Sequence, residues 1–108
     1  MLQEPYLVPV PAIFNFKVRK GAKQICVECS WPGLGWVEIK VHSPTKVYTE
    51  GDMQVTEGTS ISVGPVTTGY QSYKRCVASI PAPQTDETWR LELSLAGIAE
   101  YQLNIEVS

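Results

Sequence analysis

The sequence of 108 residues has only one histidine and three cysteines. It also lacks the motifs of common catalytic sites: a Gly-x-Ser-x-Gly elbow, a His-Glu-x-x-His pair, a phosphate-binding glycine loop followed by lysine, and a recognisable acid/base pair of carboxylates. Nucleophilic catalysis needs a nucleophile, a base and a group that orients the base, and one histidine supplies little of this. We therefore expect a domain that is not an enzyme and that needs no cofactor.

No apolar run approaches the roughly 20 residues of a membrane-spanning helix, so we expect no membrane span. Nine basic and eleven acidic side chains give a formal charge of −2. A mildly acidic chain has no general attraction to phosphate backbones, so nucleic acid is an improbable partner. Hydrophobic residues make up 44% of the chain, which favours one folded domain with its own core, without need of a disulfide framework.

The first eleven residues contain Pro5, Pro9 and Pro11, which favour an extended segment over a helix or a central strand. This segment has no basic region of the kind that begins a secretory signal. We expect residues 1–11 to be a linker or a domain boundary and residues 12–108 to be the folded domain. The chain is then one domain of a larger protein.

From residue 12 onward, most segments alternate between apolar and polar residues, which is typical of half-buried strands. The clearest apolar faces are Phe14, Phe16 and Val18; Ile25, Val27, Cys29 and Trp31; Val37, Ile39 and Val41; Trp89, Leu91, Leu93 and Leu95; and Tyr101, Leu103, Ile105 and Val107. About seven to nine strands separated by Gly/Pro-rich turns predict an all-β fold, a single antiparallel β-sandwich of jelly-roll or immunoglobulin-like type.

Two pairs of these strands are separated by short turns. Residues 24–31 and 36–42 flank the sequence WPGLG, and residues 88–95 and 101–107 flank AGIA, so we predict a hairpin at each place. A short strand is predicted at residues 46–49, weaker strand signals lie at residues 53–56 and 60–63, and a further strand is predicted over residues 71–80. The face of Cys76 is ambiguous, because either Cys76, Ala78 and Ile80 or Val77 can face the core.

Several corners of the sequence match a known pattern. Ser43 and Pro44 follow one strand, Pro81 and Pro83 precede a strand that contains Trp89, and Tyr101 and Leu103 belong to the last strand. In this the chain resembles the pre-peptidase C-terminal and related P-type β-sandwich domains, which are also found beside von Willebrand factor A-like domains in bacterial surface proteins. The resemblance covers roughly residues 13–107.

The resemblance implies a non-catalytic accessory domain that is carried outside the cytoplasm and that aids secretion, attachment or contact with a partner. Two positions depart from the family pattern: Thr45 and Lys46 follow Pro44 where glycine is usual, and Glu87 precedes Thr88 and Trp89 in place of glycine. Family members that bind calcium use clustered carboxylates, whereas Asp52 and Asp86 are far apart in this sequence. We expect no metal site.

Cys26 and Cys29 have the spacing of a metal or redox pair, but residues three apart on a strand point to opposite faces. Cys29 is then a small buried side chain and Cys26 faces outward. A disulfide between Cys76 and one of the other two, Cys29 in the first place, fits an extracytoplasmic setting. The single histidine, His42, is expected on the solvent side of its strand, and Glu28, Glu38 and Lys40 are expected to form a surface ion pair.

Exposed aromatic rings are the best candidates for binding, because a flat ring can stack on a sugar or anchor a protein partner. Trp31 and Trp89 lie on apolar faces and are expected in the core. Trp36 is out of phase with its apolar neighbours, and Tyr70 and Tyr73 have no assigned face. We therefore take Trp36, Tyr70 and Tyr73 as the candidate ligand-binding residues.

Three functions remain open. The first is an accessory domain of an exported, surface-exposed or secreted bacterial protein, acting in adhesion, attachment or spacing, with other domains of that protein or a cell-surface protein as partners. The second is a carbohydrate-binding module that uses Trp36 and nearby tyrosines. The third is an assembly domain that pairs through an exposed strand edge.

Overall fold

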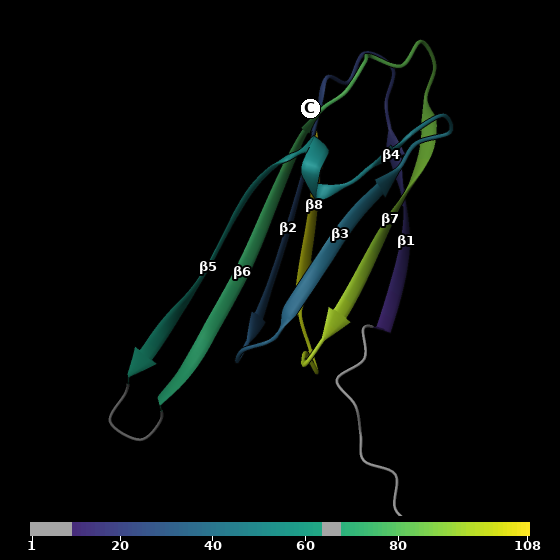
Figure 1. Ribbon diagram of the computed structural model, residues 1–108. Coiled ribbons are helices and arrows are strands. Elements are labelled where there is room, and N and C mark those ends of the chain that lie inside the picture. The colour runs from purple at the N-terminus through teal and green to yellow at the C-terminus, as the bar shows by residue number, and fades with distance from the viewer. Residues whose placement is uncertain (1–9, 64–67) are drawn as a thin grey trace, which may run out of the picture.

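The computed structural model describes residues 10–63 and 68–108, which form an all-β sandwich of two four-stranded antiparallel sheets (Figure 1). The strands are β1 (Val10–Val18), β2 (Gln24–Pro32), β3 (Trp36–His42), β4 (Val47–Tyr48), β5 (Gln54–Val63), β6 (Thr68–Ser79), β7 (Glu87–Ala96) and β8 (Gln102–Val107). A short 3-10 helix, η1 (Glu50–Asp52), precedes β5. The predicted fold class is confirmed. Most of the predicted linker lies outside the described residues, and its last two residues begin β1.

One sheet has the strand order β1-β7-β3-β4, and the other has the order β5-β6-β2-β8. We call them sheet A and sheet B. The chain changes sheet between β1 and β2, β2 and β3, β4 and β5, β6 and β7, and β7 and β8. Within the described part of the chain, no helix has the length and hydropathy that a membrane crossing requires.

Both predicted hairpins are wrong. Strand β2 pairs with β6 and β8, whereas β3 pairs with β4 and β7, so the WPGLG turn carries the chain from sheet B to sheet A. Strand β7 pairs with β1 and β3 and β8 pairs with β2, so the AGIA turn crosses in the opposite direction. Short turns and alternating faces fit either arrangement, and here each pair of strands faces across the core instead of lying side by side.

The two crossing turns touch each other at Gly35. Its φ angle is +125°, and a Cβ placed there would lie 2.8 Å from the carbonyl oxygens of both Ala96 and Gly97. Only glycine has the conformation and the small size that this approach requires. Gly35 therefore holds the beginning of β3 against the end of β7 and sets the position of the next residue, Trp36.

The core lies between the sheets and confirms the predicted faces of β2, β3 and β7. Its largest fully buried side chains are Ile25, Ile39, Leu91, Leu93, Val18, Val27, Val37, Val41, Cys29 and Cys76. The buried side chains of Cys76, Ala78 and Ile80 settle the face of β6, and Trp31 and Trp89 are buried as expected. Cys26 lies on the opposite face of β2 but is also buried, which the sequence did not indicate.

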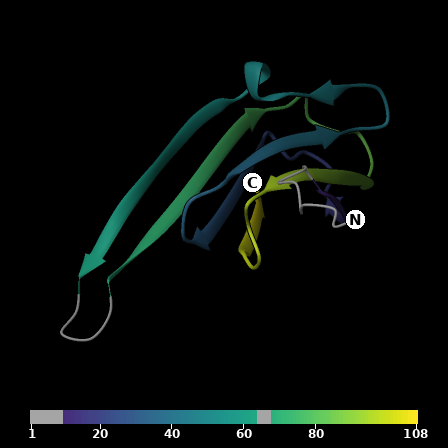
Figure 2. The same cartoon turned by 60° about the horizontal axis from the view of Figure 1, so that its bottom comes forward.

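Strands β5 and β6 form a hairpin that projects past the rest of the sandwich (Figure 2). We call this hairpin the arm. The sequence predicted two weak strands within residues 53–63, and the structure has one continuous strand there. Ser, Thr and Gly replace the apolar side chains of ordinary strands over much of β5 because sheet A does not cover this part of the arm.

Candidate functional site

The outer face of sheet B, directed away from the core, carries a trough along β2. At its centre, the small side chain of Ser30 lies between Tyr73 of β6 and Gln102 of β8, which are its two partners in the strand register. In the next row, Glu28 lies between Arg75 and Asn104 in the same way. In the row of Ser30, the long side chains on both neighbouring strands and the small one on the central strand leave a hollow between them.

Two adjoining hollows make up this trough. One has a volume of about 330 Å³ and is lined by Glu28, Ser30, Tyr73, Arg75, Gln102 and Asn104 together with the backbone of the three strands. The other has a volume of about 430 Å³ and is lined by Ser30, Pro32, Gln71, Glu100, Tyr101 and Gln102. Ser30 and Gln102 line both hollows, so the trough is continuous.

The charges of the trough are nearly balanced. The Arg75 Nε atom lies 3.2 Å from Glu28 Oε1, and both side chains are about half exposed. Glu100 adds one carboxylate at the far end. Burial, followed by the nearby Cys29 thiol, raises the pKa of Tyr101 above its ordinary value. The Tyr101 hydroxyl is therefore neutral over the physiological pH range and can both donate and accept hydrogen bonds.

The three predicted ligand-binding residues lie in different surroundings. Tyr73 is 45% exposed and lines the trough, where its ring also lies against Gly58 of the neighbouring strand. Trp36 is 49% exposed at the beginning of β3. A small cavity of about 140 Å³ between β3 and the arm has both Trp36 and Tyr73 among its lining residues. Tyr70 is on the opposite face of β6 from Tyr73, nearer the end of the arm.

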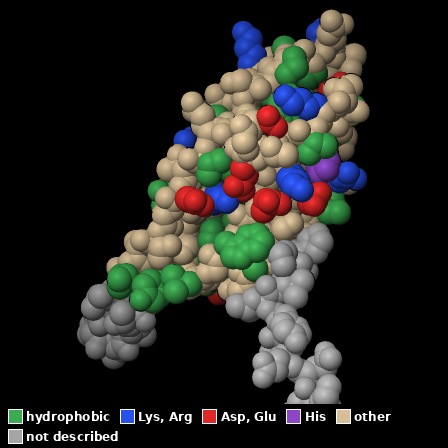
Figure 3. All heavy atoms as spheres, viewed as in Figure 1, with side chains coloured by type: hydrophobic (Ala, Val, Ile, Leu, Met, Phe, Trp, Pro, Cys, Tyr) green, Lys and Arg blue, Asp and Glu red, His purple; other side chains and the backbone are tan. Residues whose placement is uncertain are grey.

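The inner face of the arm is the side that continues the core-facing side of sheet B. Toward the end of the arm, this face exposes two large apolar side chains. Ile61 and Tyr70 are opposite each other in the strand register and are 61% and 46% exposed. Figure 3 shows hydrophobic side chains at the outer part of the arm and beside the beginning of β3. Charged side chains form a band across the middle of the same face.

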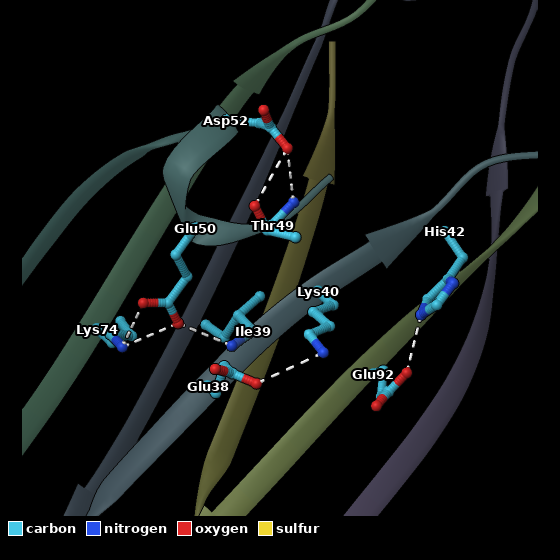
Figure 4. Close-up of polar contacts among 9 residues, drawn as sticks. All are labelled: Glu38, Ile39, Lys40, His42, Thr49, Glu50, Asp52, Lys74 and Glu92. Carbon is cyan, nitrogen blue, oxygen red and sulfur yellow. Dashed lines mark hydrogen bonds and ion pairs between the residues drawn. The ribbon is translucent and has the colours of Figure 1, made fainter. Parts of the chain in front are cut away.

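The band contains the most buried charge in the described part of the chain, Lys74 of β6. Its Nζ atom donates to both carboxylate oxygens of Glu50, at 2.8 and 2.9 Å (Figure 4). It also donates to the carbonyl oxygen of Val37 at 2.7 Å. Burial by itself would lower the pKa of Lys74. The hydrogen bonds and charge of Glu50, together with the charge of Glu57 at 3.5 Å, outweigh this effect and raise the pKa above its ordinary value. The lysine is therefore charged, and its hydrogen bonds join β6 to β3 and η1 within the domain.

Two further pairs of ionisable side chains lie in or beside β3. Lys40 lies 3.7 Å from Glu38, and His42 Nε2 lies 2.8 Å from Glu92 Oε1. The predicted pairing of Lys40 with Glu38 is confirmed. Glu28 is not part of it, because β2 and β3 are in different sheets and Glu28 contacts Arg75 instead. His42 is bound to a neighbouring carboxylate and is only partly exposed.

The corner residues that resemble the pre-peptidase C-terminal pattern meet at one end of the sandwich. Pro44, Pro81, Pro83 and Trp89 line the same hollow of about 190 Å³. Tyr48 stacks on Trp89 with ring centroids 5.9 Å apart, and the Trp89 indole donates to Glu87 Oε1 at 2.9 Å. Glu87 thus holds the buried tryptophan in place.

All three cysteines are free, buried thiols in the structure. Cys29 and Cys76 are on neighbouring strands, but the register places Cys76 opposite Val27 and Cys29 opposite Lys74. A disulfide between Cys29 and Cys76 is therefore not part of this structure. Burial raises the pKa of Cys29 to about 11 and that of Cys76 to about 12, so both thiols are protonated and weakly nucleophilic at neutral pH.

Among the residues that the structure describes, no three His, Cys, Asp or Glu side chains are grouped as metal ligands would be. The two aspartates have structural contacts. Asp52 accepts hydrogen bonds from the backbone N–H and the hydroxyl of Thr49, and these two bonds lower its pKa. Asp86 accepts a hydrogen bond from the backbone N–H of Lys20 at 2.8 Å.

Sequence reasoning found Tyr73 but missed the rest of the trough. Its members are the polar residues that alternate with core residues on three strands: Glu28 and Ser30, Arg75, and Gln102 and Asn104. The signal was present in that alternation, but the strand order was needed to bring the three strands together. The chain matches no protein-family model, no curated protein and no solved structure.

Proposed function

We propose that this domain is a non-catalytic accessory module of a larger exported protein, of the pre-peptidase C-terminal type, and that it acts by protein–protein contact through the arm. The observation that carries the proposal is the uncovered apolar face at Ile61 and Tyr70. Large apolar side chains that are exposed next to each other on a projecting element are typical of interaction sites. Another domain of the parent protein or a cell-surface protein is the expected partner.

Two further observations support the assignment to this type of accessory domain. The chain folds as an antiparallel sandwich of the kind that such modules have. Four of the residues that carry the sequence resemblance line one hollow, where Pro44 meets Pro81, Pro83 and Trp89 from a distant part of the sequence. Function outside the cytoplasm belongs to the same proposal.

The proposal is tested by site-specific photo-crosslinking in the parent protein in its native cells. A photoreactive residue at position 61 reports on the inner face of the arm, and one at Thr56, an exposed residue on the outer face of the same strand, is the matched control. We expect a defined protein adduct at position 61 and none at position 56. The identified protein should then bind the purified domain.

The contact is examined in the purified pair with Ile61→Asp. This change places a charge in the proposed interface and should weaken binding by at least about tenfold, while Thr56→Asp leaves it unchanged. Ile61 is largely exposed, so the variant should remain folded. Equal adducts at the two positions, or equal affinities of the two variants, would contradict the proposal.

A second candidate function, assembly through a strand edge, is favoured by β5. Within the described residues, β5 pairs only with β6, so its other edge is open over ten residues. The strand has no proline or lysine to protect this edge. Two β5 strands paired antiparallel about Gly58 would place Val55 opposite Ile61 and Glu57 opposite Thr59. This register joins apolar to apolar and keeps the two carboxylates apart.

Light scattering combined with size-exclusion chromatography tests this second function. A domain that assembles through β5 forms dimers as its concentration rises, whereas one that contacts only foreign proteins stays monomeric. Hydrogen exchange in the dimer should slow at the amides of residues 54–61. A monomer at all concentrations contradicts self-assembly but leaves the contact function of the arm intact.

A further inference from the structure

We infer that the trough on the outer face of sheet B is a binding site for a neutral oligosaccharide. The site is separate from the inner face of the arm, so the inference does not depend on the proposed protein contact. It also differs from the sequence-based hypothesis, in which Trp36 was the principal sugar-binding ring. Trp36 belongs to sheet A and does not line the trough.

The shape of the trough fits an extended chain of sugar rings. Its rows follow β2 from Glu28 to Pro32, a distance of about 13 Å along a strand, which accommodates roughly two sugar units. Ser30 leaves space at the centre, and Tyr73 forms one side with a ring that is 45% exposed. A flat, partly exposed ring offers a surface for the C–H groups of a pyranose.

The polar side chains provide the complementary hydrogen bonds. Gln102 and Asn104 project from β8 on one side, and Gln71 projects from β6 on the other. An amide group both donates and accepts, which matches neighbouring hydroxyl groups that do the same. Glu28 and Arg75 add a carboxylate and a guanidinium that hold each other at 3.2 Å and still face solvent.

The charge of the trough favours a neutral sugar over other polymers. Among the described residues that line the trough, Arg75 is the only cationic side chain on the outer face. It is already paired with Glu28, and Glu100 lies further along. A phosphate-bearing or strongly acidic chain would meet two carboxylates and one paired guanidinium, which is the opposite of the basic surface that binds such chains.

A peptide fits this face less well than a sugar. Extended peptides usually join a sheet at its edge, where unpaired backbone groups give them hydrogen bonds. Strand β2 is in the middle of sheet B and is paired with β6 and β8 on its two sides, so its face offers side chains only. The side chains there are mostly hydroxyls and amides, not the apolar pockets that anchor peptide side chains.

Amide NMR titration of the domain tests the inference. The probes are neutral oligomers of glucose, xylose, mannose, galactose and N-acetylglucosamine, together with an extended peptide of mixed composition. We expect at least one oligosaccharide to shift the amides of Ser30, Tyr73 and Gln102 saturably. Absence of saturable shifts with every oligosaccharide overturns the inference, and so does a peptide that shifts these amides when no sugar does.

Variants then locate the site. Tyr73→Leu keeps an apolar side chain over Gly58 but removes the flat ring, and it should weaken binding by about tenfold. Gln102→Ala removes an exposed amide and should weaken binding by about threefold to tenfold. Trp36→Ala is the matched control and should leave affinity unchanged. Loss of binding in Trp36→Ala with normal affinity in the other two would place the site at β3 and refute the trough.

Discussion

Lys74 and Glu50 together complete the hydrogen bonding of a strand edge to which neither belongs. Along β3, the backbone groups of Val37, Ile39 and Val41 point away from β7, and β4 pairs with β3 only at Val41 and His42. Beyond the end of β4, Lys74 Nζ donates to Val37 O, and Glu50 Oε2 accepts from Ile39 N at 2.8 Å. The ion pair thus stands where a neighbouring strand would otherwise lie.

This arrangement predicts that Lys74→Met destabilises the domain by about 2–4 kcal/mol. The change leaves the Glu50 carboxylate and the Val37 carbonyl without their buried donor, although Glu50 keeps some contact with water. Chemical denaturation measures the effect. Lys40→Met is the matched control, since its pair with Glu38 is exposed and should contribute less than about 0.5 kcal/mol. Equal losses in the two variants would mean that the edge contact is unimportant.

No feature of the sequence could have predicted this contact. The alternation in residues 71–80 does not indicate that a lysine faces inward, and burying a lysine is unfavourable unless it is paired. The partner of the lysine, Glu50, comes from η1, and a single helical turn is too short to give a periodic pattern in the sequence. Faces of strands were predictable because every second residue of β2, β3 and β7 is apolar. Which strands pair was not predictable. The apolar faces of two strands are buried equally well whether the strands lie side by side in one sheet or on opposite sides of the core.

The crossing turns give a second prediction. Gly35→Ala should destabilise the domain by about 3 kcal/mol or more, because it introduces both an unfavourable φ and a contact of 2.8 Å with two carbonyl oxygens. Gly33→Ala, in the same turn, also has a positive φ but no atom within 4 Å of the added Cβ, so only about 1–2 kcal/mol is expected. Thermal or urea unfolding of the two variants compares these losses directly.

If Gly35→Ala and Gly33→Ala cost the same, the contact between the turns adds nothing beyond the backbone conformation. The larger loss that we expect would show that the register of β3 against the end of β7 depends on this approach. Trp36 follows directly, and its indole signal in amide NMR should move in Gly35→Ala but not in Gly33→Ala.

The candidate site was predictable only in part, because the order of the strands in each sheet cannot be deduced from the alternation of apolar and polar residues. An aromatic residue out of phase with its neighbours is visible in the sequence, which is how Trp36 was found. Tyr73 was selected without a face. In the structure it lies beside Ser30 and in one row with Gln102, and these two residues come from strands far away in the sequence. A trough that is built across three strands has no local signature. It depends on which strands are neighbours.

The buried thiols predict how stability depends on pH. Burial raises the folded-state pKa of Cys29 to about 11 and that of Cys76 to about 12, from 9.0. The unfolded chain therefore loses these protons at lower pH than the folded chain does. The stabilisation is complete below about pH 9 and is lost as the pH rises toward the folded values, by about 1 kcal/mol for each thiol at pH 10.

Denaturation of the wild type and of Cys76→Ala at pH 7.5 and pH 10 isolates this effect. Cys76→Ala leaves a small cavity and so lowers the free energy of unfolding at both pH values. Between pH 7.5 and pH 10, however, the variant should lose about 1 kcal/mol less stability than the wild type does. An equal loss in both proteins would show that the Cys76 thiol titrates normally. Thiol-specific reagents should also react with Cys29 and Cys76 only under unfolding conditions.

The last prediction concerns the open edge of β5 and compares two substitutions of opposite charge at Thr59. In the register centred on Gly58, Thr59 of each copy is opposite Glu57 of the other. Thr59→Glu places two carboxylates in contact and should weaken self-association, while Thr59→Lys creates an ion pair across the edge and should strengthen it. Both variants lose the same hydrogen bond between Thr59 and Ser72. Unfolding of each variant by denaturant measures what the new charge, which also lies near Glu57 of its own strand, does to the monomer.

Sedimentation equilibrium of the two variants and the wild type gives the dimerisation constants. The order expected is Thr59→Lys tightest, wild type next and Thr59→Glu weakest, with a total span of about tenfold at low ionic strength. Because the charges are exposed, added salt should bring the three values together. The reverse order would exclude pairing about Gly58. In that register, residue 59 is opposite Glu57 of the second copy, so a lysine there must favour the dimer and a glutamate must oppose it.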